Sequence, residues 1–215
     1  MLTTTTLPYR SMKRLTLSVA LLAAVATSLS AQGRPVRISA LSGGLAHLSA
    51  LVVDPAGSSD TRLSAGPTFG LEIQHPTLSF GSLYAGVAGS FSTLEHGANL
   101  AAAAGAGSSG ATVVLATGGL VLEASDWFAN VRPTMRLGGG IKYYMFSANG
   151  ASSNLTLTGD VGAGFRGGTG PVEILAEVRF LPSAFDQAKL PLRSFTPQDQ
   201  AQNDLLFTIG VTIKP

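Results

Sequence analysis

Residues 171–181, PVEILAEVRFL, alternate apolar and polar side chains with a period of two. An extended strand points successive side chains to opposite faces, so the pattern predicts a strand with one apolar and one polar face. The apolar face carries Val172, Ile174, Ala176, Val178 and Phe180, and the other face carries Glu173, Leu175, Glu177 and Arg179. The pattern recurs about eight times, with turn residues between the repeats, which indicates a β-barrel.

Each of the eight predicted strands is long enough for a tilted membrane strand of about 9–11 residues. No segment after residue 31 keeps an apolar period of 3.6 residues, so we expect an all-β chain folded as a closed antiparallel up-and-down transmembrane barrel. The strands are predicted at 36–52, 62–74, 82–95, 111–123, 134–146, 154–166, 171–181 and 204–214.

The connections between these strands alternate in character. Barrels of the outer membrane have short turns at the periplasmic end and longer loops outside. The connections expected outside are 53–61, 96–110, 147–153 and 182–203, and those expected inside are 75–81, 124–133 and 167–170.

The polar faces of the strands consist mainly of small residues with a few charges. A face in contact with water would favour longer polar side chains, whereas a narrow lumen needs side chains that fit inside it. We therefore expect the apolar faces to contact lipid. The lumen charges are then expected to form a packed network of ion pairs rather than an ion pathway, and they comprise Arg62, Glu72, Arg136, Lys142, Asp160, Arg166, Glu173, Glu177 and Arg179.

Two points about orientation stay open. Strand 111–123 is apolar on both faces, so its inward face is not predicted. Alternation also fits a soluble periplasmic or secreted barrel, with its apolar side inward around a hydrophobic ligand.

The first 31 residues have the features of a secretory signal peptide. Met12-Lys13-Arg14 precedes the apolar run 15–25, and a stretch of small residues then leads to Ala31. Residues 1–11 are expected to be a start-site extension, and residues 32–215 to form the barrel domain. Cleavage of this signal peptide would remove three basic residues and no acidic ones. The formal charge of +2 then becomes −1, from 11 basic and 12 acidic residues, and no basic tract remains for nucleic acid.

Composition supports a barrel in a membrane. Charged residues make up 12% of the chain, against about 25% in ordinary soluble domains, so little charge is available for a water-exposed surface. The chain has no cysteine, which excludes a disulfide framework and thiolate metal sites.

No motif predicts a catalytic, cofactor or metal site. His47, His75 and His96 lie in separate segments without ligand spacing. His47 and Ser49 share a predicted strand face, and this His-x-Ser pair resembles that of outer-membrane lipid A deacylases, with Glu72 or Glu123 as the possible acid. A base must lie within about 2.6–3.2 Å of its proton donor, directly or through a water. We expect the pair to be incidental and the chain not to be an enzyme.

The mature chain resembles the small OmpA/OmpX-type outer-membrane barrel proteins in its alternation, strand number and loop pattern. Residues 203–214, NDLLFTIGVTIK, are similar to the closing strand of such barrels, although this chain ends Ile213-Lys214-Pro215 where many end on an aromatic residue. The resemblance implies a monomer in the bacterial outer membrane, with a structural or loop-mediated binding role. Expected partners are outer-membrane lipids and, in transit, the barrel-assembly machinery and periplasmic chaperones. A narrow channel or a lipid A-modifying enzyme is a less favoured alternative.

Overall fold

The computed structural model describes residues 36–53, 60–95, 109–124, 130–148, 150–190 and 199–214. The expected signal peptide at 1–31, with its extension 1–11, and His96 lie outside these residues. In the part of the chain described, no helix is both long and apolar enough to cross a membrane.

Eight long strands dominate the described residues, which confirms the eight predicted strands. They are β1 (Arg37–His47), β3 (Gly66–Leu78), β4 (Gly81–Glu95), β5 (Ser109–Glu123), β6 (Val131–Phe146), β7 (Asn154–Gly167), β8 (Val172–Asp186) and β9 (Asp199–Ile213). A two-residue strand, β2 (Arg62–Leu63), precedes β3, and a 3-10 helix, Gln187–Lys189, follows β8. Strands β8 and β9 extend beyond the predicted ends, into the expected connection 182–203, because they stay paired as far as Asp186 and Asp199.

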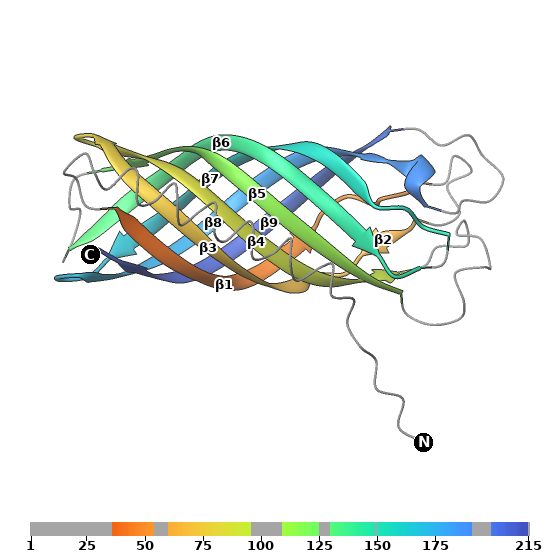
Figure 1. Ribbon diagram of the computed structural model, residues 1–215, viewed down its shortest axis with the longest axis horizontal. Coiled ribbons are helices and arrows are strands. Elements are labelled where there is room, and N and C mark those ends of the chain that lie inside the picture. Colours follow the sequence, from red (N-terminus) through yellow and green to blue (C-terminus); the bar gives the residue numbers. More distant parts are fainter. Residues whose placement is uncertain are drawn as a thin grey trace, which may run out of the picture.

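The sheet closes on itself, as Figure 1 shows. Strand β1 pairs with β3 on one side and with β9 on the other, where Ile38 lies opposite Ile213. The remaining pairs follow the chain from β3 through β9, and every pair is antiparallel. The fold is therefore a closed up-and-down antiparallel barrel of eight long strands, as the sequence predicted.

The two ends of the barrel differ. At the turn end, β1 begins, β9 ends, and residues 79–80 and 168–171 join β3 to β4 and β7 to β8. Gly170 in the second turn has a φ of 77°, a conformation that favours glycine. The longer connections lie at the opposite end, which we call the loop end, and they include those between β4 and β5 and between β8 and β9.

The exterior is apolar and the interior carries the charges. On β6, Met135, Leu137 and Ile141 are exposed, whereas Arg136 and Lys142 are buried. The same alternation holds on β8, where the exposed residues include Val172, Ile174, Val178 and Phe180, and the buried ones include Glu173, Glu177 and Arg179. A soluble barrel would have the reverse distribution, so the soluble alternative does not fit the described residues.

Closure also settles the orientation of β5, which its own sequence left open. Val113, Leu115 and Val121 point inward and are buried, while Leu122 is exposed outside. The pairing with β4 and β6 decides this, because Val121 lies opposite Ser82 on one side and Arg136 on the other, and both are buried. Cross-strand neighbours in a register share one face of the sheet.

The prediction that Arg62 lies in the lumen is wrong. Its side chain is 58% exposed and pairs with Asp60, 2.9 Å away, while Leu63 is buried. Leu63 of β2 pairs with Leu94, and Thr68 of β3 pairs with Ser90. The five residue positions from Leu63 to Thr68 are therefore matched by only four positions along β4. One extra residue forms a bulge, and a shift of one residue moves a side chain to the other face.

Candidate functional site

The interior of the barrel is the candidate site, and Arg136 lies near its middle. Its Nη1 donates to Glu72 Oε2 at 2.6 Å, and its Nη2 donates to Glu177 Oε2 at 2.7 Å. Glu72 is on β3 and Glu177 is on β8, and neither strand adjoins β6. The Arg136 guanidinium also lies 4.2 Å from the centre of the Tyr84 ring, close enough for a cation–π interaction. One buried cation therefore joins three other strands across the lumen.

A second buried cluster surrounds Asp160 on β7. Arg179 forms an ion pair with Asp160, and the Tyr84 hydroxyl donates to Asp160 Oδ2 at 2.6 Å. Arg179 Nη2 also donates to Thr117 Oγ1 at 2.8 Å. Tyr84 contacts both this cluster and Arg136, so the two clusters form one network that fills the middle of the barrel.

Glycines on β7 make room for this network. A Cβ atom at Gly162 would lie 2.9 Å from Arg179 Cγ, and one at Gly164 would lie 2.8 Å from Glu177 Cγ. The Cβ atom at Gly162 would also lie 2.8 Å from the Val178 carbonyl oxygen, and the one at Gly164 would lie closer still to the Ala176 carbonyl oxygen, so both the backbone and the side chains of β8 exclude a larger residue. The small residues on the polar faces are therefore the counterpart of long charged side chains on the next strand.

The turn end of the interior holds two carboxylates among four cations. Glu123 forms ion pairs with Arg37, with Arg166 Nη1 at 2.5 Å and with Arg132 Nη1 at 3.4 Å. Glu173 forms ion pairs with Arg132 and with Lys214 Nζ, which lies 2.5 Å away. The sequence analysis missed Arg37, Arg132 and Lys214, because they lie at or beyond the predicted strand ends.

The loop end of the interior holds Lys142, which has three hydrogen-bond partners. Its Nζ lies 2.7 Å from Asp204 Oδ2, 2.8 Å from Ser183 Oγ and 3.1 Å from the Leu181 carbonyl oxygen. Asp204 was not predicted as a lumen charge. Its alternation with Leu206 and Thr208, all buried on β9, is the signal that identifies it.

His47 belongs to this loop-end cluster, and its partners differ from those expected. His47 Nδ1 lies 2.8 Å from Asp204 Oδ1, and Nε2 lies 3.2 Å from Ser92 Oγ. Ser49 Oγ instead accepts a hydrogen bond from the Asn203 backbone, 3.2 Å away, and Glu72 is engaged by Arg136. The expected acids Glu72 and Glu123 thus bind arginines, and the His47–Ser49 arrangement does not form in the described structure.

An apolar cluster lies above the polar network toward the loop end. Residues 50–52 follow β1 and are buried, and Leu51 and Val52 belong to one cluster with Tyr144, Phe185 and other apolar side chains of the wall. The Tyr144 and Phe185 rings meet edge to face with their centres 5.3 Å apart. The described interior is therefore packed throughout. Charged groups predominate from its middle to the turn end, and toward the loop end apolar groups accompany the Lys142–Asp204 pair.

Of the nine predicted lumen charges, the structure places eight inside the barrel and Arg62 outside. The interior ones all take part in ion pairs, namely Glu72, Arg136, Lys142, Asp160, Arg166, Glu173, Glu177 and Arg179. Chemically, this arrangement holds strands together across the lumen. Few of its charged groups are left free to act on a solute.

An apolar exterior around a charged and filled interior defines the class of small transmembrane β-barrels. Similar solved structures include Neisserial surface protein A, with 14% identity, a TM-score of 0.48 and coverage of 84% of this chain and 97% of that chain. The attachment invasion locus protein Ail of Yersinia pestis has 12% identity, a TM-score of 0.43 and coverage of 83% and 97%. A major outer membrane protein from Thermus thermophilus has 9% identity, a TM-score of 0.46 and coverage of 84% and 99%. No protein-family model and no curated protein matches the chain.

Proposed function

We propose that this chain is an integral protein of a bacterial outer membrane, whose barrel is a closed anchor for the connections at the loop end. The observation that carries the proposal is the distribution of side chains, with leucine, methionine and phenylalanine exposed outside and ion pairs buried inside. Exposed apolar surface around a whole barrel is stable in lipid and promotes aggregation in water. Any specific binding then belongs to the loop end, since loops carry binding functions on rigid scaffolds.

The packed interior favours an anchor over a pore. Arg136, Asp160 and Lys142 each have charged partners, and the apolar cluster with Leu51 and Val52 fills the space toward the loop end. Water-filled channels are found in barrels of about 16–18 strands, whereas barrels of about eight strands are filled by side chains.

Cell fractionation tests the membrane location. We expect the full chain to be recovered in the outer-membrane fraction and to need detergent for extraction. An unheated sample should migrate differently on SDS gels from a boiled one, because a closed barrel resists SDS until it is heated. Recovery in the soluble fraction without detergent would contradict the proposal, and a known periplasmic protein serves as the control for complete lysis.

We further propose that the barrel is not an enzyme, although Asp204, His47 and Ser92 are linked in the order found in serine hydrolases. The side chains of His47 and Asp204 are fully buried, Ser92 is nearly so, and Lys142 also binds Asp204. A nucleophilic serine must reach the substrate carbonyl beside donors for the oxyanion. We therefore expect no release of fatty acid from lipid A or from a p-nitrophenyl ester. Release that disappears in Ser92→Ala, with the barrel still heat-modifiable, would contradict this.

A further inference from the structure

The wall of the barrel opens between β7 and β8 at the loop end. Their pairing runs from Gly167 opposite Ile174 to Val161 opposite Phe180, and it recurs once at Thr158 opposite Ser183. Residues 154–157 of β7 have no partner on β8, although β7 stays paired with β6 through Asn154 opposite Tyr144. Strand β8 likewise stays paired with β9 to its end. Both strands are thus continuous, and the separation lies between them.

Pro182 accounts for the start of this separation. It lies opposite Gly159 in the register, and its ring is close enough that a Cβ atom at Gly159 would lie 3.0 Å from Pro182 Cγ. Proline has no backbone N–H and interrupts a ladder. The Thr158 hydroxyl instead donates to the Pro182 carbonyl oxygen at 3.0 Å. Beyond the opening, the Ser152 N–H donates to the Lys189 carbonyl oxygen at 2.7 Å, so the opening is a window with closed ends.

A cavity of about 520 Å³ occupies this window. Its lining includes Asn154, which is buried, together with Leu155 and Ala184, which are exposed. Inward-facing and outward-facing residues of the same wall both contribute, and they come from β7 and β8 where the two strands separate. Its volume falls within the range of about 300–1,000 Å³ that is usual for small-ligand sites.

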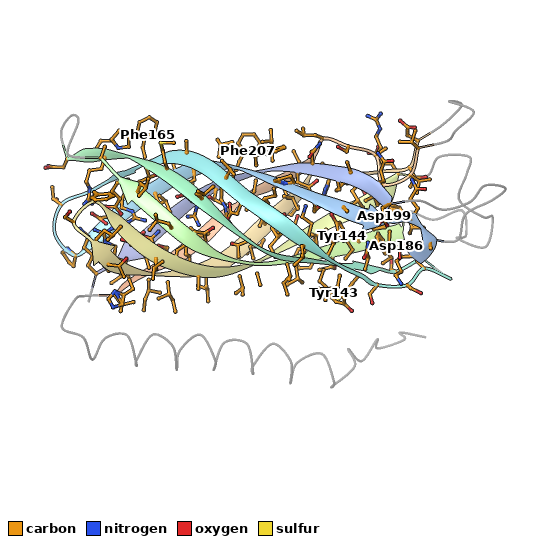
Figure 2. All side chains as sticks on the ribbon, turned by 90° about the horizontal axis from the view of Figure 1, so that it is seen from above. Tyr143, Tyr144, Phe165, Asp186, Asp199 and Phe207 are labelled. Carbon is orange, nitrogen blue, oxygen red and sulfur yellow. The ribbon has the colours of Figure 1, made fainter. Side chains whose placement is uncertain are left out.

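Polar groups of several kinds converge on the cavity. Asn154 is buried, and its side-chain nitrogen has no hydrogen-bond partner among the described residues. Asp186, Lys189 and Asp199 also line the cavity, and Figure 2 shows Asp186 and Asp199 near each other at the loop end. Lys189 Nζ lies 3.6 Å from Asp186 Oδ2 in a partly exposed ion pair, which leaves further hydrogen-bonding positions on both groups. A buried amide without a partner is unfavourable unless another group supplies an acceptor. One lysine and two aspartates give the lining a formal charge of −1, which disfavours an anionic ligand.

We propose that this window is a lateral binding site for a hydroxyl-rich saccharide, carried as the headgroup of an uncharged membrane glycolipid. Sugar hydroxyls both donate and accept, so they match carboxylates together with the donors of Asn154 and Lys189. The window opens onto the apolar exterior, where Leu155 and Leu157 are exposed and can contact acyl chains. This assignment rests on the proposed membrane location and adds a ligand class to it.

Native mass spectrometry of the full chain in detergent tests the site. The probes are digalactosyldiacylglycerol, phosphatidylglycerol and free digalactose. We expect one glycolipid to be retained per barrel, phosphatidylglycerol to be released, and free digalactose to compete weakly. Asn154→Leu should lower glycolipid retention about tenfold, because one hydrogen bond to the headgroup is lost. This variant should fold, since it replaces a buried polar group without a partner by an apolar one of similar size.

Thr68→Val is the matched control, because Thr68 Oγ1 is also buried without a partner but lies away from the window. It should retain the glycolipid as the parent chain does. Equal retention of both lipids, or an Asn154→Leu variant that binds like the parent, would overturn the proposal. Binding of free digalactose as tight as that of the glycolipid would overturn the lipid source and keep the saccharide. If a peptide were retained in place of lipid, the window would instead be a site where an added strand pairs with β7 or β8. Heat-modifiable migration of the same samples shows whether the barrel is folded. Loss of glycolipid from a sample that keeps this migration therefore contradicts the binding site and not the proposed membrane barrel.

Discussion

Replacing Arg136 by methionine should lower the free energy of unfolding of the barrel by about 3–5 kcal/mol. The substitution removes the cation that binds both Glu72 and Glu177 and leaves two carboxylates buried without it. Removing one partner of a buried pair is strongly destabilising, because the remaining charge has lost both water and its counterion. The measurement is a urea unfolding series in lipid vesicles, followed by the heat-modifiable shift on gels.

Two controls distinguish the loss of a counterion from the loss of packing. The triple variant Glu72→Gln/Arg136→Met/Glu177→Gln also replaces both carboxylates by neutral amides. Most of the free energy of unfolding that Arg136→Met loses should therefore be regained. Arg62→Met removes an arginine whose ion pair with Asp60 is largely exposed, so a change of only about 0–1 kcal/mol is expected. If the triple variant were as unstable as Arg136→Met, the destabilisation would come from packing rather than from unpaired charge.

Val178→Arg should destabilise the folded barrel by about 2–4 kcal/mol in a bilayer. Val178 is exposed on the exterior, near the middle of β8, where it lies between Ala163 of β7 and Phe207 of β9. Figure 2 shows Phe207 well inside the length of the barrel, which places Val178 at a similar depth. A charged guanidinium would then face the acyl chains in place of an apolar side chain. The free-energy cost of this exposure is largest near the centre of the bilayer.

Val172→Arg is the matched control for this substitution. Val172 lies on the same exposed face of the same strand, but it is the first residue of β8 at the turn end. An arginine there can reach the interface, so the expected change is about 0–1 kcal/mol. The two variants are compared by urea unfolding in vesicles and again in detergent. Equal stability of both variants in vesicles would show that this face does not cross the bilayer.

Local periodicity accounts for what the sequence predicted well. On β8, a period of two separates Val172, Ile174 and Val178 from Glu173, Glu177 and Arg179, and the structure keeps that separation. A strand needs no information from its neighbours to have two faces. Strand β5 shows the limit of this reasoning, because its two faces were equally apolar until pairing with β4 and β6 oriented it.

The errors share a different cause. Arg62 was assigned to the wrong face because a bulge between Leu63 and Thr68 adds one residue relative to β4. Arg37, Arg132 and Lys214 were missed at or beyond the predicted strand ends, because the extent of a strand depends on where its neighbour ends. Asp204 was missed although its alternation with Leu206 and Thr208 marks it as inward-facing. His47 could be placed on an inward face, but its contacts depend on closure of the sheet, which places Asp204 of β9 directly opposite it, and on Ser92 of β4, a strand that does not adjoin β1.

The sequence by itself determined an all-β chain with eight strands, and it determined which face of most strands is apolar. These features are local, because they depend on residues next to each other in the chain. The tertiary structure alone decided the orientation of β5, the bulge beside Arg62, the partners of every buried charge and the window between β7 and β8. Those features depend on register and closure, which bring together residues far apart in the chain and which no short segment encodes.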